Sequence, residues 1–67
     1  MTQEQNEVVT RLQTQYKTTM LNKTQAAREL NVSVTQIDRL RKRGELNYKT
    51  VGSLVRIPAS VIAEIIA

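Results

Sequence analysis

The segment from Asn31 to Gly44 concentrates the side chains that could recognise an anionic polymer. Four cations occur within five positions: Arg39, Arg41, Lys42 and Arg43. Guanidinium and ammonium groups bind phosphates, and arginine can also bind guanine through two hydrogen bonds. Glutamine can pair with adenine, and a threonine methyl can contact thymine. The chemistry on offer is therefore noncovalent contact with nucleic acid.

A short amphipathic helix must position these groups. Ser33 and Gln36 predict a capping box, in which the serine hydroxyl accepts from a first-turn amide and the glutamine side chain reaches back. Gly44 suits the left-handed backbone just past a helix end. At about 100° per residue, the apolar side carries Val34, Ile37 and Leu40, and the opposite side carries Thr35, Arg39, Lys42 and Arg43. We expect the apolar side to anchor the helix to a core.

Base contacts on this helix are expected from Thr35, Gln36 and Arg39. Two alternatives stay open, because helix capping competes with base contact for the Gln36 side chain and because phosphate suits Arg39 as well as guanine does. The other candidates on this helix are Ser33, Lys42 and Arg43, the last two as phosphate clamps.

Asp38 needs a partner, because a carboxylate on a groove-facing helix repels phosphate unless it accepts a hydrogen bond from cytosine or pairs with a cation. Lys42 lies four residues later, which is a spacing that favours ion pairs on a helix. We expect Asp38 to pair with Lys42. The stem of Arg41 should pack beside the apolar side, while its charged head reaches a phosphate or stays solvated.

The composition excludes several classes of protein. The 67 residues make one small domain and include no cysteine and no histidine. Disulfides, zinc–thiolate sites and the commonest general base are thereby absent, so we expect no enzyme, catalytic residue, metal or cofactor. A net charge of +4 and a pI near 10.0 fit a nucleic-acid binder, although an ordinary solvated surface is the alternative.

The remaining bulk features narrow the partner. Two tyrosines and no other aromatic residue disfavour single-strand binding, which relies on base stacking. No apolar run approaches the roughly 20 residues of a membrane span, and the N-terminus lacks the apolar core of a signal peptide. We expect no membrane contact and a cytoplasmic location.

Residues 1–19 are expected to form an N-terminal helix or arm ahead of a domain over residues 20–67. Val8, Leu12 and Tyr16 recur every four residues, which predicts one amphipathic helix from about Glu4 to Tyr16. It could pack on the core, form a self-association face or fray. We favour packing on the core.

A second capped helix should precede the basic one. Asn22 and Gln25 predict a capping box, and residues 23–30 carry Ala26 and Ala27, whose small side chains let another helix approach closely. Asn31 tolerates the left-handed conformation that ends such a helix. Two helices joined by this short turn predict a helix-turn-helix.

After Gly44 the pattern changes to that of a β-hairpin followed by a helix. Residues 48–51 and 54–57 are β-prone runs flanking Gly52-Ser53, which suits a type II′ turn. Alternation should put Val55 and Ile57 on one face, and Pro58 should open a terminal helix over residues 58–66. The DNA-contact candidates outside the basic helix are Thr24, Lys49, Gly52, Ser53 and Arg56. Expected core residues at the two chain ends are Val8, Leu12, Ile62 and Ile66.

This order of elements resembles the MerR-like winged-helix superfamily, and within it the small excisionase group. The likeness covers residues 20 to 66 and is carried in register by Ala26-Ala27, Asn31-Val32-Ser33, Ile37, Arg39-Leu40, Arg43-Gly44-Glu45-Leu46 and Val55-Arg56-Ile57. Asn31 replaces the usual glycine, and the N-terminal extension departs from the shortest members. The expected fold is mainly α with a small β-hairpin: a winged helix-turn-helix with an extra N-terminal helix.

The resemblance implies an architectural protein of a phage or mobile element. Such proteins bind double-stranded DNA near recombination sites, often in tandem with self-association, and bend it so that an integrase assembles for excision. Several also regulate transcription. Two alternatives stay open: a small transcriptional regulator of the same fold, and a protein–protein adaptor that docks a recombinase or other phage protein.

Overall fold

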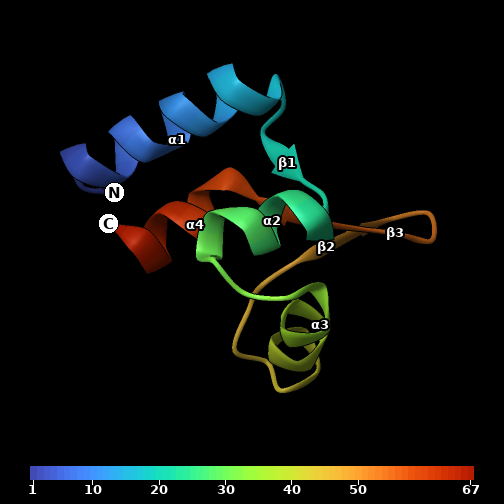
Figure 1. The fold of residues 1–67 in the computed structure, drawn as a ribbon. Helices are drawn as coiled ribbons and strands as arrows, with labels where there is room; N and C mark the ends of the chain where they lie inside the picture. Colours follow the sequence, from blue (N-terminus) through green and yellow to red (C-terminus); the bar gives the residue numbers. More distant parts are fainter.

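The computed structural model describes all residues 1–67 and contains four helices and one three-stranded sheet. In chain order the elements are α1 (Gln3–Tyr16), β1 (Met20–Leu21), α2 (Lys23–Leu30), α3 (Val34–Lys42), β2 (Lys49–Val51), β3 (Leu54–Pro58) and α4 (Ala59–Ile66) (Figure 1). Helices α2 and α3 form the helix-turn-helix, and the β2–β3 hairpin projects from the helices as a wing. The expected fold class is confirmed.

Local hydrogen bonds fix the two ends of α2. At its start, Asn22 Oδ1 accepts from the Gln25 amide at 2.8 Å, and Gln25 Oε1 accepts from the Asn22 amide at 3.0 Å, so the predicted capping box is confirmed. At its end, Asn31 adopts φ 57° and the Val32 amide donates to the Ala27 carbonyl at 3.0 Å. This Schellman closure satisfies the last carbonyls of α2 and sets the direction of the turn into α3.

Helix α3 ends in the same way. Gly44 has φ 74°, and the Glu45 amide donates to the Leu40 carbonyl at 2.9 Å. The last helical residue is Lys42, so Gly44 lies just beyond the helix, as its backbone preference predicts. The chain then turns back, and Leu46 becomes buried between α3 and the wing, at 2% exposure.

The sheet contains a strand that the sequence pattern did not predict. The two residues of β1 pair antiparallel with the end of β3, with Met20 opposite Pro58 and Leu21 opposite Ile57. The strand order is therefore β1-β3-β2, and a further bond from the Ala59 amide to the Thr19 carbonyl at 2.8 Å extends the pairing. The two-stranded sheet expected from the sequence is wrong in this respect, because pairing between such distant residues leaves no local periodicity.

The wing has the expected turn and the expected faces. Gly52 has φ +64° whereas Ser53 does not have a positive φ, which fits a type II′ turn and excludes type I′. Ile57 is fully buried and Val55 packs against the core, while Leu54 is exposed, so the predicted alternation is confirmed.

The core joins all four helices and the sheet. The large side chains of the core that have no exposed surface are Leu12, Leu21, Ile37, Ile57 and Ile62. Helix α1 lies along α4 (Figure 1). It begins with a capping box at Thr2, which was not predicted from the sequence. The favoured interpretation of the α1 stripe, packing on the core, is confirmed by the burial of Leu12.

Three expectations about apolar and helix-start positions were wrong. Ile66 and Val34 are 41% and 37% exposed, so neither belongs to the core, and Ile65 is 53% exposed. In α4 the core-facing positions are Ile62 and its small neighbours Ala59 and Ala63. Because α4 is apolar almost all round, its sequence could not show which stripe faces inward. Pro58 is the last residue of β3 and the N-cap of α4, so it precedes the helix instead of being its first residue.

A polar network fastens α1 to α2. The Tyr16 hydroxyl donates to Glu29 Oε2 at 2.6 Å, and Arg11 Nη2 donates to Glu29 Oε1 at 2.9 Å. The Tyr16 hydrogen bond, followed by Arg11, holds the pKa of Glu29 below its usual value despite the opposing effect of burial. The same hydrogen bond raises the pKa of Tyr16. The ionised form of Glu29 is therefore the one that stabilises the folded chain.

This network predicts an acid-sensitive stability. A carboxyl whose folded pKa is lowered contributes stability that is present above its ordinary pKa of 4.5 and is lost as the pH falls through the folded pKa. We expect Glu29→Gln to lower the melting temperature at pH 7 and to flatten its decline below about pH 5. Thermal unfolding followed by circular dichroism from pH 2 to 7 measures this, with exposed Glu64→Gln as control. Parallel curves for wild type and Glu29→Gln would contradict it.

Candidate nucleic-acid interface

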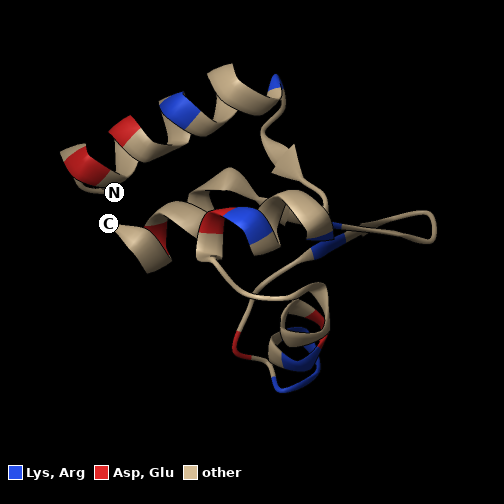
Figure 2. Cartoon of the chain, viewed as in Figure 1, with Lys and Arg blue, Asp and Glu red and all other residues tan.

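The outward face of α3 carries a shallow polar hollow of about 320 Å³. It is lined by Thr35, Asp38, Arg39 and Lys42, with no hydrophobic residue among them. Thr35, Arg39 and Lys42 are exposed, and neither cation forms an ion pair. The structure thus brings together three of the predicted contact residues on one side of one helix. Lys and Arg gather at the end of α3 and at the base of the wing (Figure 2).

The opposite face of α3 is anchored to the core. Ile37 is fully buried and Leu40 packs against the core cluster, so two of the three apolar positions do what the periodicity predicts. Val34, in the first turn, does not. An anchored inner face fixes the direction in which Arg39 and Lys42 point, which leaves their charged heads in solvent.

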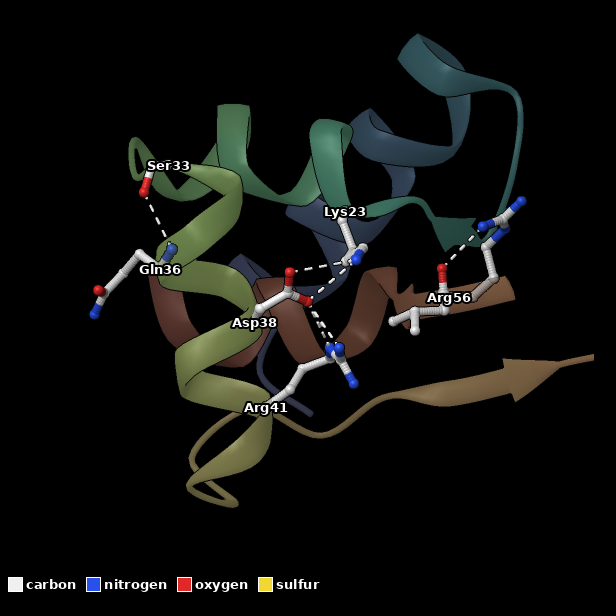
Figure 3. Close-up of polar contacts among 7 residues, drawn as sticks. Lys23, Ser33, Gln36, Asp38, Arg41 and Arg56 are labelled. Atoms are coloured by element: carbon white, nitrogen blue, oxygen red, sulfur yellow. Dashed lines mark hydrogen bonds and ion pairs between the residues drawn. The ribbon is translucent and has the colours of Figure 1, made fainter. Parts of the chain in front are cut away.

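The capping box expected at the start of α3 is only half formed. Ser33 Oγ accepts from the Gln36 amide at 3.1 Å, but the Gln36 side chain does not return the bond (Figure 3). Instead Gln36 Oε1 accepts from Arg39 Nη1 at 3.3 Å. The Gln36 side chain therefore bonds to Arg39 on the surface of α3 instead of capping the helix. We call these two residues a linked pair.

Asp38 has partners other than the expected one. Its Oδ1 accepts from Arg41 Nη2 at 2.7 Å and from Lys23 Nζ at 3.1 Å, and it forms no ion pair with Lys42 (Figure 3). The first turn of α2 brings Lys23 beside α3, and Arg41 lies on the same side of α3 one turn along. Both compete successfully with Lys42. The expected Asp38–Lys42 pair is wrong, and Lys42 stays unpaired.

Arg41 is bound within the protein and is not free to contact DNA. Its side chain is 15% exposed, and its guanidinium lies over the Tyr48 ring, 4.7 Å from the ring centre. The hydrogen bond with Asp38 holds the pKa of Arg41 above its usual value, and that bond together with Lys23 lowers the pKa of Asp38. The expectation of a phosphate or solvent partner is therefore wrong. The Asp38–Arg41 spacing was readable from the sequence, whereas the roles of Lys23 and Tyr48 were not.

A second hollow, of about 460 Å³, lies between the start of α2 and the wing. Its lining residues are Asn22, Lys23, Thr24, Ser53, Leu54, Val55 and Arg56. The structure thus brings Thr24, which the sequence assigned to the first helix of the helix-turn-helix, together with Ser53 and Arg56 of the wing.

The wing residues differ in how they are held. Lys49 lies opposite Arg56 in the β2–β3 register, so their side chains share one face of the wing. Arg56 Nη1 donates to the Val55 carbonyl at 2.8 Å, which orients its guanidinium (Figure 3). Gly52 is at the tip, where a Cβ would meet nothing within 4 Å, so the glycine serves the positive φ of the turn rather than a close contact inside the chain.

Arg43 is held more loosely than Arg41. Its Nη1 lies 3.8 Å from Glu45 Oε2, and both side chains are more than half exposed. Exposed pairs of this length contribute little and exchange readily with other partners. None of the four helices combines the length and the hydrophobicity that a membrane-spanning helix needs. No group of three or more His, Cys, Asp or Glu side chains is placed to hold a metal ion.

Comparison with known proteins identifies the fold family. A family model described as a helix-turn-helix domain matches residues 20–67, from β1 through the end of α4. No curated protein and no solved structure matches the chain. The match contains α2, α3 and the wing, which carry every candidate contact residue described above. The chain therefore belongs to the helix-turn-helix domain family and is a protein that binds double-stranded DNA.

Proposed function

We propose that this protein recognises specific double-stranded DNA sites by laying α3 in the major groove. One observation carries the proposal. Arg39 and Lys42 are exposed and unpaired on the outward side of a helix whose inner side is fixed by buried Ile37. A groove-reading helix needs this combination, because a misdirected cation reaches phosphates but not base edges.

The roles divide by position on α3. Arg39 and Gln36, linked by their hydrogen bond, are the base-reading pair, and Thr35 beside them contacts a thymine methyl. Linking two readers limits the rotamers that each must lose on binding. The phosphate contacts on this helix come from Ser33, Lys42 and Arg43.

The hollow between α2 and the wing gives a second contact. Thr24 and Ser53 offer hydroxyls, and Arg56 offers an oriented guanidinium, all lining the same hollow. Such groups bind a phosphate of the DNA backbone and so fix the register of α3 in the groove. Lys49 supplies charge on the same face of the wing as Arg56, and Gly52 lets the tip approach a strand closely.

The more specific role that we propose is that of an excisionase: a factor that binds beside a recombination site and bends DNA for an integrase. The support is the resemblance of residues 20–66 to that group, together with the small basic domain. Bending by tandem copies requires contacts on both sides of each domain, and α3 and the wing provide two separated contacts.

Footprinting the protein on the DNA that flanks its own gene tests the proposal. Clustered protection near an integrase site, with excision that needs both proteins, supports the excisionase role. Protection over a promoter, with unchanged excision, supports the alternative of a transcriptional regulator. Absence of protection at any tested DNA contradicts DNA recognition altogether.

The adaptor alternative rests on one observation. Ile65 and Ile66 are exposed on the last turn of α4, away from α3 and the wing (Figure 1). An apolar pair there could dock a recombinase. Tight binding of the integrase that survives alanine substitution of Arg39 and Lys42, and is lost on Ile65→Ser, would support this alternative.

The electrostatic part of the proposal predicts a strong salt dependence. If about six phosphates are neutralised, the logarithm of the binding constant should fall against the logarithm of salt concentration with a slope near −5. Fluorescence anisotropy with a labelled duplex between about 50 and 200 mM salt measures the slope. A slope near zero would reject phosphate contact as the main source of affinity.

A further inference from the structure

Asp38 is the only carboxylate on α3, and it lies in the hollow with Thr35, Arg39 and Lys42. Its side chain is 31% exposed. A bare carboxylate at this place would repel the phosphates of DNA and weaken binding. Here two cations, Lys23 and Arg41, pair with it and neutralise that repulsion.

The hydrogen bonds of Asp38 are unevenly shared between its two oxygens. Oδ1 accepts from Arg41 Nη2, Arg41 Nε and Lys23 Nζ, at 2.7, 3.3 and 3.1 Å. Oδ2 accepts only from Lys23, and at 3.4 Å. A carboxylate oxygen has two lone-pair sites, so Oδ2 keeps acceptor capacity. The carboxylate is also held from two directions, by α2 through Lys23 and by α3 through Arg41 (Figure 3).

We propose that Asp38 is a specificity-determining residue that accepts a hydrogen bond from the N4 amino group of a cytosine in the major groove. This inference rests on the proposed function and deepens it. An ionised carboxylate only accepts, and guanine and thymine offer only acceptors at their polar major-groove atoms. Adenine offers an amino group, but its N7 acceptor lies beside it and repels the second oxygen. Cytosine alone presents a donor without that neighbour.

The neighbours of Asp38 complement the rest of such a base pair. A C·G pair shows a donor on cytosine and two acceptors on guanine. Arg39 follows Asp38 directly and Lys42 lies one turn further, both lining the same hollow and both unpaired. A carboxylate beside a cation therefore matches the donor–acceptor pattern of C·G. The lowered pKa of Asp38 keeps it ionised at neutral pH.

Selection from a randomised duplex library, followed by binding titrations, tests the inference. The proteins are wild type, Asp38→Asn, Asp38→Ala and a control, Glu45→Gln, which removes an exposed carboxylate just beyond α3. Wild type and control should require cytosine at one position, with about tenfold weaker binding to the other bases there. Asp38→Ala should bind duplexes with any of the four bases at that position with equal affinity. Asp38→Asn should shift the preference to adenine, because asparagine pairs with its N6 and N7.

The base preferences of wild type and of the variants distinguish a failure of this inference from a failure of the proposed function. If Asp38→Asn and Asp38→Ala weaken all sites equally and keep the wild-type preference, Asp38 only holds α3 against α2 and the inference is overturned. If Asp38→Ala does not fold, the isosteric Asp38→Asn decides alone, with its fold checked by circular dichroism. If wild type enriches no sequence, the proposed function fails first and this inference fails with it.

Discussion

Replacing both Arg39 and Lys42 by alanine is expected to weaken binding to the cognate duplex by about 2–4 kcal/mol, which is roughly thirtyfold to a thousandfold. Both side chains are exposed and neither forms an ion pair, so no carboxylate of the protein neutralises the charge that each offers to DNA. Removing the Arg39 contact with a base should also relax the preference at one position. The loss at Lys42 should be uniform across sequences and should reduce the salt slope by about one.

Arg28→Ala is the matched control for this pair. Arg28 is an exposed cation on α2 that forms no ion pair. Its charge acts on Tyr16 and Glu29, which places it near α1 and not on the outward face of α3. Fluorescence anisotropy with the same duplex should show almost unchanged affinity for Arg28→Ala. Equal losses for Arg28→Ala and for either cation of the pair would mean that net charge alone drives binding.

Leu12→Ala is expected to have the largest effect on stability, about 2–5 kcal/mol. Leu12 has no exposed surface and is the α1 residue that enters the core cluster, beside Ile62 and Leu21. A single core in so small a domain rarely supplies more than about 3–5 kcal/mol, so the variant should be largely unfolded at 37 °C. Urea denaturation followed by circular dichroism measures the change.

Leu54→Ala removes the same atoms from an exposed position on the wing. Leu54 is 53% exposed, so its truncation should change stability by less than about 0.5 kcal/mol. The contrast also tests the division of the chain into an N-terminal segment, residues 1–19, and a domain over residues 20–67, which is still a prediction. If Leu12→Ala costs as little as Leu54→Ala and leaves DNA binding intact, α1 is dispensable and residues 20–67 fold alone.

Much of the fold was predictable because its signals are local. The caps at Asn22 and Ser33, the left-handed residues Asn31 and Gly44, and the turn at Gly52 each depend on interactions within a few residues of sequence. Periodicity likewise predicted that Ile37 and Leu12 face inward. In these places propensity, capping and packing agree, so a reading of the chain alone was sufficient.

The errors have a common physical origin. Strand β1 lies in a short β-prone stretch, residues 18–21, but its pairing depends on a partner far along the chain, which no short window can reveal. Ile66 and Val34 are apolar and correctly spaced, yet each lies on a terminal turn of its helix and is exposed. Asp38 was assigned the nearest cation in helical spacing, whereas Lys23 came from another helix.

By itself the sequence determined which segments are helical, where α2 and α3 begin and end, and that one face of residues 34–42 is cationic. Those properties follow from backbone preferences and from side-chain spacing along a single element. Only the tertiary structure decided that Arg41 is tied to Asp38 and Tyr48, that Lys42 is unpaired, and that Thr24 lies in one hollow with Arg56. The reason is that ion-pair partners are chosen by the distance between packed elements, which depends on how α2 and the wing dock against α3.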